Sequence, residues 1–205
     1  YKSASINKKL FTPGKTANTL GGLKHQKGQW HLIRAFSEVV KQIPDAKLLI
    51  FGRGDLEQYL KELIKGLKLE KNVSLMGYVI GPYDYVKQSD VFVFSSLYEG
   101  LGNALMEALK CGIPVISTDY TSGAREILAP STNYKHKTKS VDFAEYGILV
   151  PNPDGKKYNF NDPITKAEKM LADAIIDTLS NKKLNAKYRK KSARRAADFD
   201  IKRIA

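Results

Sequence analysis

Only one cysteine, Cys111, occurs among the 205 residues. An internal disulfide framework is therefore excluded, which fits a reducing compartment. No apolar run approaches the roughly 20 residues that a transmembrane helix needs. Acidic side chains are also scarce, 21 against 34 basic ones, so the formal net charge is +13. We therefore expect a cytoplasmic protein whose partners are anionic: phosphates, nucleic acid or the acidic inner face of a membrane.

The positive charge is concentrated near the C-terminus, where the segment 181–203 contains ten Lys or Arg. A solvated helix with basic faces is the simpler interpretation, and a surface that lies against anionic lipid or nucleic acid is the alternative. Single-strand binding proteins interleave aromatic residues with their basic ones, and among the densest basic residues here, 182–195, Tyr188 is the only aromatic one. Nucleic acid is therefore the least favoured partner.

Apolar periodicity predicts alternating helices and strands. The apolar residues of 28–43 fall on one helical face, and 46–52 is the continuous apolar run typical of a buried parallel strand. Further strands are expected at 19–23, 72–79, 90–96, 113–118 and 147–151, and further helices at 54–69, 82–89, 101–111 and 162–180. This alternation predicts an α/β fold, a Rossmann-like doubly wound parallel sheet.

Three parts of the chain are expected to differ in organisation. Residues 1–18 are predicted to be a linker, 19–180 the Rossmann-like domain, and 181–205 a basic C-terminal helix. Within the domain, 130–144 is polar and basic without periodicity, which predicts a long surface loop. The last helix of the domain is expected to open with Asp162 as its cap and Pro163 in its first turn.

Glycine-containing segments follow four of the predicted strands, at 21–28, 52–55, 77–79 and 95–103. In an open parallel sheet the carboxyl ends of the strands lie along one edge, and ligands bind there. A single glycine pair is a weak signal, because any loop of such a fold uses glycine. We expect the four segments to open on the same edge, and this convergence favours a binding site.

The segment 95–109 predicts a phosphate site at the start of a helix. The helix is expected to begin near Leu101, so the backbone amides of Gly100–Asn103 lie at its N-terminus, where they can hold a phosphate. Gly100 and Gly102 remove side chains that would block the approach. The apolar face of this helix is expected to consist of Leu101, Leu105, Ala108 and Leu109.

The hypothesis that this segment binds a ribose-containing ligand rests on two glutamates. Glu107 shares a helical stripe with Asn103 and can accept hydrogen bonds from a pair of ribose hydroxyls. Glu99 would lie nearer the reacting end of the ligand. A carboxylate beside an anion costs free energy unless a cation is also present, and Lys27 could supply it. The spacing alone equally allows a helix start with Glu99 near its cap and Glu107 on the surface.

Five segments together resemble the C-terminal, donor-nucleotide-binding half of a GT-B glycosyltransferase of the family 4 retaining type. They are 22–36, 46–55, 72–79, 90–119 and 122–128, and the resemblance covers 18–180. Its most specific part is the pair of glutamates with seven residues between them and a strand on either side. The resemblance implies that 19–180 is a sugar-nucleotide-binding domain.

The resemblance also implies a role for each matching residue. Glu107 would bind the ribose hydroxyls and Glu99 the donor sugar, with Lys27 neutralising the diphosphate. The amides of Gly100, Leu101, Gly102 and Asn103 would hold the diphosphate, with Leu101 and Gly102 next to the sugar. Val79 would lie under the base and offer it backbone hydrogen bonds, and Arg53 would border the nucleotide.

One position departs from the pattern of the family. Gly22 stands where the family usually has an arginine, five residues before its lysine. One of two cations on the departing diphosphate is then missing, and losing such a contact can cost on the order of 100-fold in rate. Lys24 could substitute, although a lysine is a point charge and not a bidentate fork.

The resemblance implies transfer with retention of anomeric configuration and without a metal or other cofactor. The Asp-x-Asp form occurs at 198–200, on the C-terminal helix and away from the strand ends, so we assign it no metal. The three histidines show no ligand spacing. His25 is expected at the edge of the cleft, and His31 and His136 on the surface.

Most of the acceptor side is expected outside this chain. In the family it belongs to an N-terminal domain that would precede residue 1, so we expect this chain alone to bind a sugar nucleotide and to transfer little or no sugar. A UDP-linked donor is favoured over a GDP-linked one by its frequency in the family. A glycan or lipid-linked acceptor, as in bacterial polysaccharide biosynthesis, is the corresponding expectation.

Three alternatives stay open at this stage. A sugar-nucleotide epimerase would use the same architecture, but it needs an acid and a base in the cleft. A catalytically degenerate sugar-nucleotide-binding module is suggested by Gly22. A nucleic-acid-binding protein is suggested by charge alone, and steep salt dependence of its binding would distinguish it.

Overall fold

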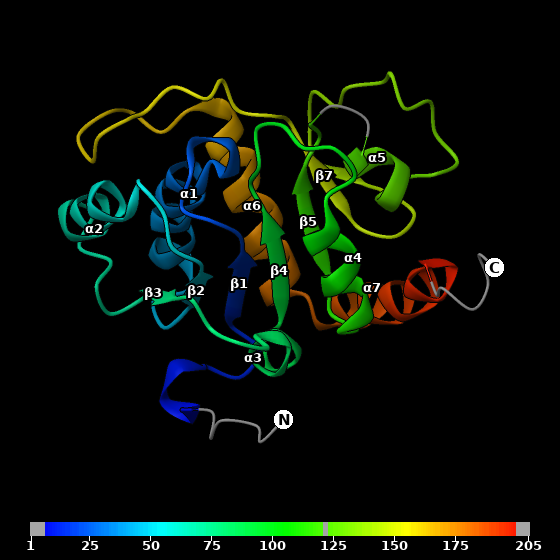
Figure 1. The fold of residues 1–205 in the computed structure, drawn as a ribbon, viewed down its shortest axis with the longest axis horizontal. Coiled ribbons are helices and arrows are strands. Elements are labelled where there is room, and N and C mark those ends of the chain that lie inside the picture. The colour runs from blue at the N-terminus through cyan, green and yellow to red at the C-terminus, as the bar shows by residue number, and fades with distance from the viewer. Residues whose placement is uncertain (1–6, 121–122, 200–205) are drawn as a thin grey trace.

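A seven-stranded sheet with helices on both faces forms the core of the molecule, which we describe from a computed structural model covering residues 7–120 and 123–199 (Figure 1). Its order is β3-β2-β1-β4-β5-β7-β6, with all neighbours parallel except β6 and β7. The strands are β1 (Thr16–Leu20), β2 (Lys47–Phe51), β3 (Val73–Gly77), β4 (Val91–Phe94), β5 (Val115–Thr118), β6 (Asp142–Phe143) and β7 (Ile148–Val150). The predicted doubly wound α/β sheet is therefore present.

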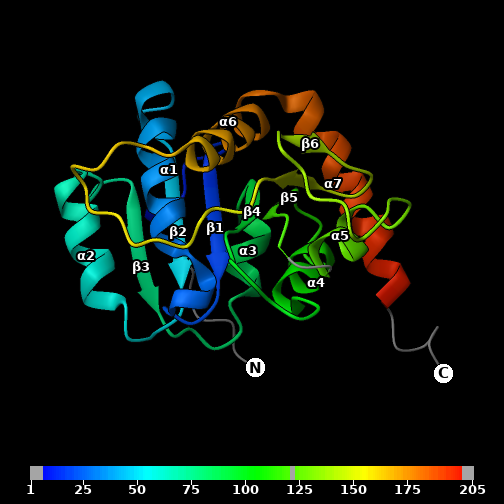
Figure 2. The same cartoon turned by 90° about the horizontal axis from the view of Figure 1, so that it is seen from above.

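Helices cover both faces of the sheet, as the view from above shows (Figure 2). One face packs against α1 (Gln29–Gln42), α2 (Glu57–Gly66) and α6 (Lys166–Ser180). The other packs against α3 (Tyr83–Gln88), α4 (Asn103–Lys110) and α5 (Gly123–Leu128). The final helix, α7 (Lys182–Ala196), contacts both α4 and α6. Single 3₁₀ turns lie at Lys8–Leu10, His25–Lys27 and Ala197–Phe199.

Alternation along β2 shows why its continuous apolar run is needed. Leu48 and Ile50 point into the core beneath α1 and α2, whereas Leu49 and Phe51 point into the core beneath α3 and α4. All four side chains are at most 3% exposed. Because side chains alternate across a strand, a strand buried on both faces is apolar at every position unless a polar side chain finds a hydrogen-bond partner.

The strand order reverses at β1, which pairs with β2 on one side and β4 on the other. The chain leaves β1 toward β2 through α1 on one face and leaves β4 toward β5 through α4 on the other face, so the separation of these two connections lies at the carboxyl ends of β1 and β4. In sheets of this class that separation is where ligands bind.

The first strand begins earlier than the sequence predicted. Strand β1 runs over Thr16–Leu20 instead of 19–23, so residues 16–18 are part of the sheet and not of the linker expected at 1–18. Ala17 and Asn18 are fully buried, and the Asn18 amide donates to the Val91 carbonyl at 3.3 Å. The start of this strand was not predicted because Thr16 and Asn18 are polar and interrupt the apolar pattern. Residues 1–6 lie outside the described part of the chain.

Two predicted helix starts were also displaced. Thr165, and not Asp162, caps α6: its hydroxyl accepts from the Glu168 amide, and the Glu168 carboxylate accepts from the Thr165 amide, forming a capping box. Helix α4 begins at Asn103, so Leu101 precedes it and is 47% exposed instead of lying on the apolar face. The other three residues assigned to that face, Leu105, Ala108 and Leu109, are fully buried.

The basic C-terminal segment is helical, as expected, and is anchored to the fold by its polar and aromatic side chains. Tyr188 is fully buried in α7, and its hydroxyl donates to the Ala144 carbonyl at 3.0 Å. Ser192 donates to the Ile113 carbonyl at 2.8 Å, and Arg195 donates to Ile127 at 2.9 Å. Residues 200–205 lie outside the described part.

The segment 130–137 is exposed throughout, in agreement with the expected surface loop. The following segment contributes the short strand β6, which the sequence did not predict. Within the residues that the structure describes, none of the helices combines the length and the apolar character that crossing a membrane requires.

Candidate functional site

The loops that follow β1 and β4 are fastened to each other. The Ser95 hydroxyl donates to the Lys27 carbonyl at 2.9 Å, and the Leu97 amide donates to the Gln26 carbonyl at 2.8 Å. Gly28 makes this approach possible: its φ is +57°, and a Cβ there would lie 2.5 Å from the Ser95 carbonyl oxygen. Lys27 is thereby held opposite the turn that carries Glu99.

The loops that follow β1 and β2 are joined in the same way. The Gly21 amide donates to the Phe51 carbonyl at 3.0 Å, and the Leu23 amide donates to the Arg53 carbonyl at 3.0 Å. Gly52 has a φ of +141°, and any Cβ at this position would overlap the Gly21 carbonyl. Backbone contacts therefore fix the positions of three loops before any ligand is bound.

A pocket of about 820 Å³ opens at this edge of the sheet. It brings together six of the residues that the sequence predicted for the site: Gly22, Lys27, Arg53, Val79, Asn103 and Glu107. Lys27 and Glu107, separated by 80 positions in the sequence, face one common cavity. This volume falls within the range of small-molecule sites, about 300–1,000 Å³.

Five predicted residues do not line this pocket. Lys24 is exposed on its loop, and its Cγ lies 3.7 Å from the position that a Cβ of Gly22 would occupy. The other four, which form the turn leading from β4 into α4, are Glu99, Gly100, Leu101 and Gly102.

The Glu99 carboxylate is bonded on both of its oxygens. Oε1 accepts from the Lys27 ammonium, with which it forms an ion pair, and from the Ser96 hydroxyl at 2.9 Å. Oε2 accepts from the Gln26 amide at 2.8 Å. The side chain of Glu99 is 12% exposed and that of Lys27 is 22% exposed. The Glu99 carboxylate, which lies three residues before the N-cap of α4, is therefore held by side chains of two loops, and Gln26 and Ser96 are partners that sequence reasoning missed.

The N-terminus of α4 points toward the pocket through Asn103. Its N-cap is Gly102, whose φ is +79°, and no side chain among the described residues forms a capping hydrogen bond there. A Cβ at Gly102 would overlap the hydroxyl of the buried Tyr120, which lies behind the turn. The first amides of α4 therefore remain available to an anion.

The far wall of the pocket comes from the segment after β3. Tyr78 and Ile80, which are 69% and 74% exposed, line it together with Tyr83. Burial and then the charge of Glu107 raise the pKa of the Tyr83 hydroxyl. Ile80 and Tyr83 were not predicted as site residues. Their sequence signal is weak: each is a large apolar side chain next to a turn residue, Gly81 or Pro82, where an exposed polar side chain is usual.

One of the three histidines, His31, lies elsewhere than predicted. His31 was expected on the surface but is fully buried in α1, where its Nδ1 lies 2.8 Å from the Glu168 carboxylate. His25 is exposed and its Nε2 lies 3.0 Å from the Gly155 carbonyl oxygen. His136 is exposed. In residues 7–120 and 123–199, no three His, Cys, Asp or Glu side chains gather closely enough to hold a metal ion.

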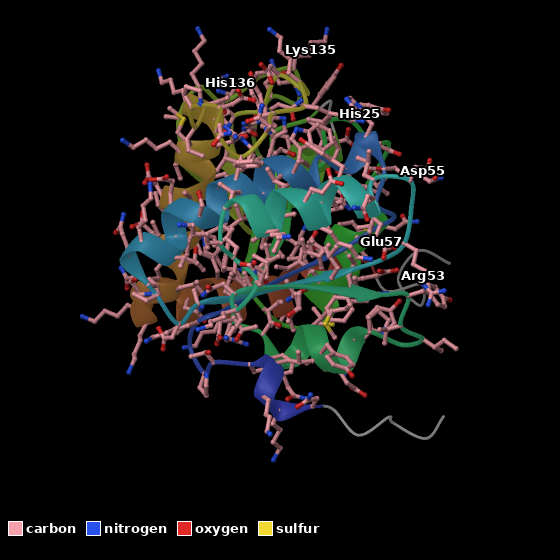
Figure 3. The ribbon with its side chains drawn as sticks, turned by 90° about the vertical axis from the view of Figure 1, so that its left-hand side faces the viewer. His25, Arg53, Asp55, Glu57, Lys135 and His136 are labelled. Atoms are coloured by element: carbon pink, nitrogen blue, oxygen red, sulfur yellow. The ribbon has the colours of Figure 1, made fainter. Side chains whose placement is uncertain are left out.

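Figure 3 shows the site edge in side view, with His25, Arg53 and Asp55 along the same side of the molecule. A second hollow, of about 730 Å³, lies near Asp45 and Asp90. There Lys15 pairs with Asp45 at 2.8 Å, and burial raises the pKa of Asp90. It contains none of the predicted site residues.

Comparison with known proteins gives a consistent result. Residues 3–148 match the family model of glycosyl transferases group 1. An uncharacterised glycosyltransferase of Methanocaldococcus jannaschii is 44% identical over 189 residues, covering 90% of this chain and 46% of the relative. The N-acetylgalactosamine-N,N'-diacetylbacillosaminyl-diphospho-undecaprenol 4-alpha-N-acetylgalactosaminyltransferase of Campylobacter jejuni is 34% identical, covering 91% and 43%.

Solved structures share the fold. The pneumococcal O-GlcNAc transferase GtfA, crystallised with UDP and GlcNAc, superposes with a TM-score of 0.74 at 23% identity, covering 92% of this chain and 33% of that one. The predicted fold, one half of a GT-B glycosyltransferase, is thus confirmed. The chain spans less than half the length of the two curated relatives described above. The chain belongs to the glycosyl transferases group 1 family.

Proposed function

We propose that this chain is the donor-binding domain of a retaining, family 4 glycosyltransferase that transfers a hexosyl-type sugar from a nucleoside diphosphate sugar. The observation that carries the proposal is the common pocket of Lys27 and Glu107 at the carboxyl ends of the strands. A cation for the diphosphate and a carboxylate for the ribose face the same cavity, next to an uncapped helix N-terminus.

The chemistry follows from these parts. The bond that breaks joins the anomeric carbon of the sugar to a phosphate oxygen, so negative charge develops on the departing nucleoside diphosphate. Lys27 and the first amides of α4 stabilise that charge in place, without reorganisation during the reaction. Glu107 holds the ribose, and Glu99 binds the donor sugar while its carboxylate orients the Lys27 ammonium.

The relatives support the nature of the two substrates. A UDP-linked donor is proposed because structural neighbours were solved with UDP. A glycan or lipid-linked acceptor is proposed because one relative is named for transfer to a diphospho-undecaprenol-linked acceptor and another for poly(ribitol-phosphate). An N-terminal GT-B domain would supply most of the acceptor site, and the basic surface of α7 would allow peripheral contact with a membrane.

Calorimetric titration of this chain with UDP, GDP and ADP tests the donor site. We expect saturable binding of at least one diphosphate, weakened at least about tenfold in Glu107→Ala and unchanged in Lys65→Ala, which alters an exposed residue in the last turn of α2. Turnover by the full-length enzyme, with the anomeric configuration of the product determined by NMR, tests transfer and retention. Binding of nucleic acid alone would contradict the proposal.

A catalytically degenerate nucleotide-binding module is the second candidate, and Gly22 favours it. The pocket contains two cationic residues, Lys27 and Arg53, and Lys27 is already paired with Glu99. A full-length protein that binds the sugar nucleotide tightly but releases no nucleoside diphosphate over hours would establish this alternative. Turnover on the order of 1 s⁻¹ or faster, usual for enzymes, would exclude it.

A further inference from the structure

Arg53 belongs to one loop through its backbone and faces another through its side chain. Arg53 follows β2, and its carbonyl oxygen accepts from the amide of Leu23, in the loop after the neighbouring strand β1, at 3.0 Å. Its Nε lies 3.7 Å from the position that a Cβ of Gly77 would occupy, so its guanidinium group lies over the end of β3. Figure 3 shows Arg53 at the edge of the molecule where the strand beside it ends.

The guanidinium charge of Arg53 is available to a ligand. The side chain is exposed and has neither an ion pair nor a hydrogen bond within residues 7–120 and 123–199. Glu57, whose pKa is lowered first by its hydrogen bond to Lys61 and also by the charge of Arg53, is bonded to Lys61 at 2.7 Å. Glu57 therefore has another partner, and the five N–H donors of Arg53, a residue that lines the pocket, have none among the described residues.

Strand order separates Arg53 from the diphosphate end of the pocket. Lys27 and the start of α4 lie beyond β1 and β4, whereas the Arg53 side chain lies beyond β3 with Tyr78 and Val79. On the proposed function, the diphosphate occupies the first end and the nucleobase the second. Arg53 would then lie next to the polar edge of the nucleobase, where its N–H groups can donate hydrogen bonds.

We infer that Arg53 selects the nucleobase, by donating to a carbonyl oxygen at C4 of a pyrimidine or C6 of a purine. Uracil and guanine carry an oxygen at these positions, which accepts a hydrogen bond from the guanidinium. Cytosine and adenine carry an amino group there, whose N–H would face the N–H of the guanidinium, so no hydrogen bond can form. This inference rests on the proposed function. A bidentate guanidinium contact, as on O6 and N7 of guanine, discriminates between bases by roughly 5- to 100-fold, and a contact to the single oxygen at C4 of uracil lies at the lower end of this range.

Paired titrations test the inference, because UDP and CDP differ at C4 and at the adjacent ring nitrogen. The wild-type chain is expected to bind UDP at least about fivefold more tightly than CDP. In Arg53→Gln, whose amide can donate or accept, the ratio of the two affinities should fall to near one. Arg53→Lys keeps the charge without the fork, so the ratio should fall there as well. Lys65→Gln, which removes an exposed charge from α2, should leave the ratio unchanged.

A comparison of UMP with UDP separates a contact to the base from a contact to the phosphates. Arg53→Gln should weaken UMP and UDP by the same factor if Arg53 contacts the base. An equal loss for UDP, CDP, GDP and ADP, or a loss that disappears with UMP, would overturn the inference in favour of a phosphate contact. Should the wild-type chain bind no nucleotide at all, the proposed function itself would be wrong. Equal thermal melting of all variants confirms that each is folded.

Discussion

The Lys27 ammonium contacts the Glu99 carboxylate across the ends of β1 and β4, although 72 positions separate the two residues in the sequence. The contact depends on Gly28, because only a residue without a Cβ lets the loop after β1 approach the Ser95 carbonyl. A cation that faces a carboxylate has less attraction left for a phosphate. On the proposed function, the pair is therefore expected to lower the affinity of the empty site for the diphosphate.

Glu99→Gln should strengthen binding of the nucleoside diphosphate while it slows transfer. The substitution removes the negative charge beside Lys27 but retains an oxygen that can accept from it. We expect UDP to bind this chain about threefold to tenfold more tightly, the equivalent of up to about 1.4 kcal/mol. Turnover by the full-length enzyme should fall, since the donor sugar loses its carboxylate. Isothermal titration and initial rates measure the two effects, and weaker UDP binding would show that Glu99 does not compete for Lys27.

Lys27→Met should weaken both binding and transfer, because the methionine fills similar space without a charge. Loss of one preorganised electrostatic contact costs on the order of 100-fold or more in rate. Lys24→Met is the matched control: it removes an exposed lysine from the same loop that does not line the pocket. Rates of the full-length enzyme at saturating donor make the comparison. A similar loss in both variants would mean that the general positive potential matters, and not the position of Lys27.

Glu107→Ala should lose affinity only for nucleotides that carry ribose hydroxyls. Hydrogen bonds to a charged group contribute roughly 1.5–3 kcal/mol each, so UDP should bind at least about tenfold more weakly. The 2′-deoxy analogue of UDP should already bind the wild-type chain weakly, and the substitution should change its affinity much less. Titration of both nucleotides against both proteins forms a double-mutant cycle. Equal losses for UDP and its deoxy analogue would assign Glu107 to another part of the ligand.

Local sequence patterns were sufficient to predict most of the fold. The apolar run of β2 and the one-faced periodicity of α1 identify both elements without tertiary information. Strand β1 was misplaced because Thr16 and Asn18 are polar yet buried, and their hydrogen-bond partners, the Thr12 and Val91 carbonyls, belong to other segments. Propensity cannot detect a polar side chain that is satisfied by a distant strand.

The candidate site was predictable where it depends on strand ends and unpredictable where it depends on side-chain packing. Lys27 and Glu107 line one pocket because topology brings the strand ends together. His31 was missed because its partner, Glu168, lies 137 positions away and reaches it only through the packing of α6 on α1. Leu101 was misplaced because α4 begins two residues later than its apolar pattern.

Gly22→Arg should increase the affinity for the diphosphate. A Cβ at Gly22 would lie 3.5 Å from the nearest atom, the Arg53 carbonyl oxygen, which is ordinary van der Waals contact. Gly22 also lines the pocket with Lys27, so an arginine there would add a bidentate donor to the phosphate end. We expect UDP to bind about tenfold more tightly and turnover to rise if the missing cation limits it. Unchanged affinity in a variant with a normal melting temperature would show that the arginine does not reach the phosphates.

Glu168→Gln should remove an acid-sensitive part of the stability. Burial alone would raise the pKa of Glu168, but the hydrogen bonds from His31 and then Arg34 outweigh it and lower the pKa from 4.5 to about 2. A carboxyl whose pKa is lower in the folded state stabilises the fold above its unfolded pKa, and this contribution is lost as the pH falls from about 4.5 to about 2. At about 1.4 kcal/mol for each pKa unit, the contribution at pH 7 is about 3 kcal/mol.

Urea denaturation of Glu168→Gln between pH 2 and pH 7, followed by the fluorescence of the buried Trp30, tests this expectation. The variant should be about 3 kcal/mol less stable than the wild type at pH 7 and should approach it in stability near pH 2. Glu70→Gln, which alters an exposed glutamate between α2 and β3, should follow the wild-type curve. Because Arg34 also donates to the carbonyls of Asp162 and Pro163, the variant retains part of the network and should still fold. A wild-type pH dependence that survives in Glu168→Gln would place the acid-sensitive group elsewhere.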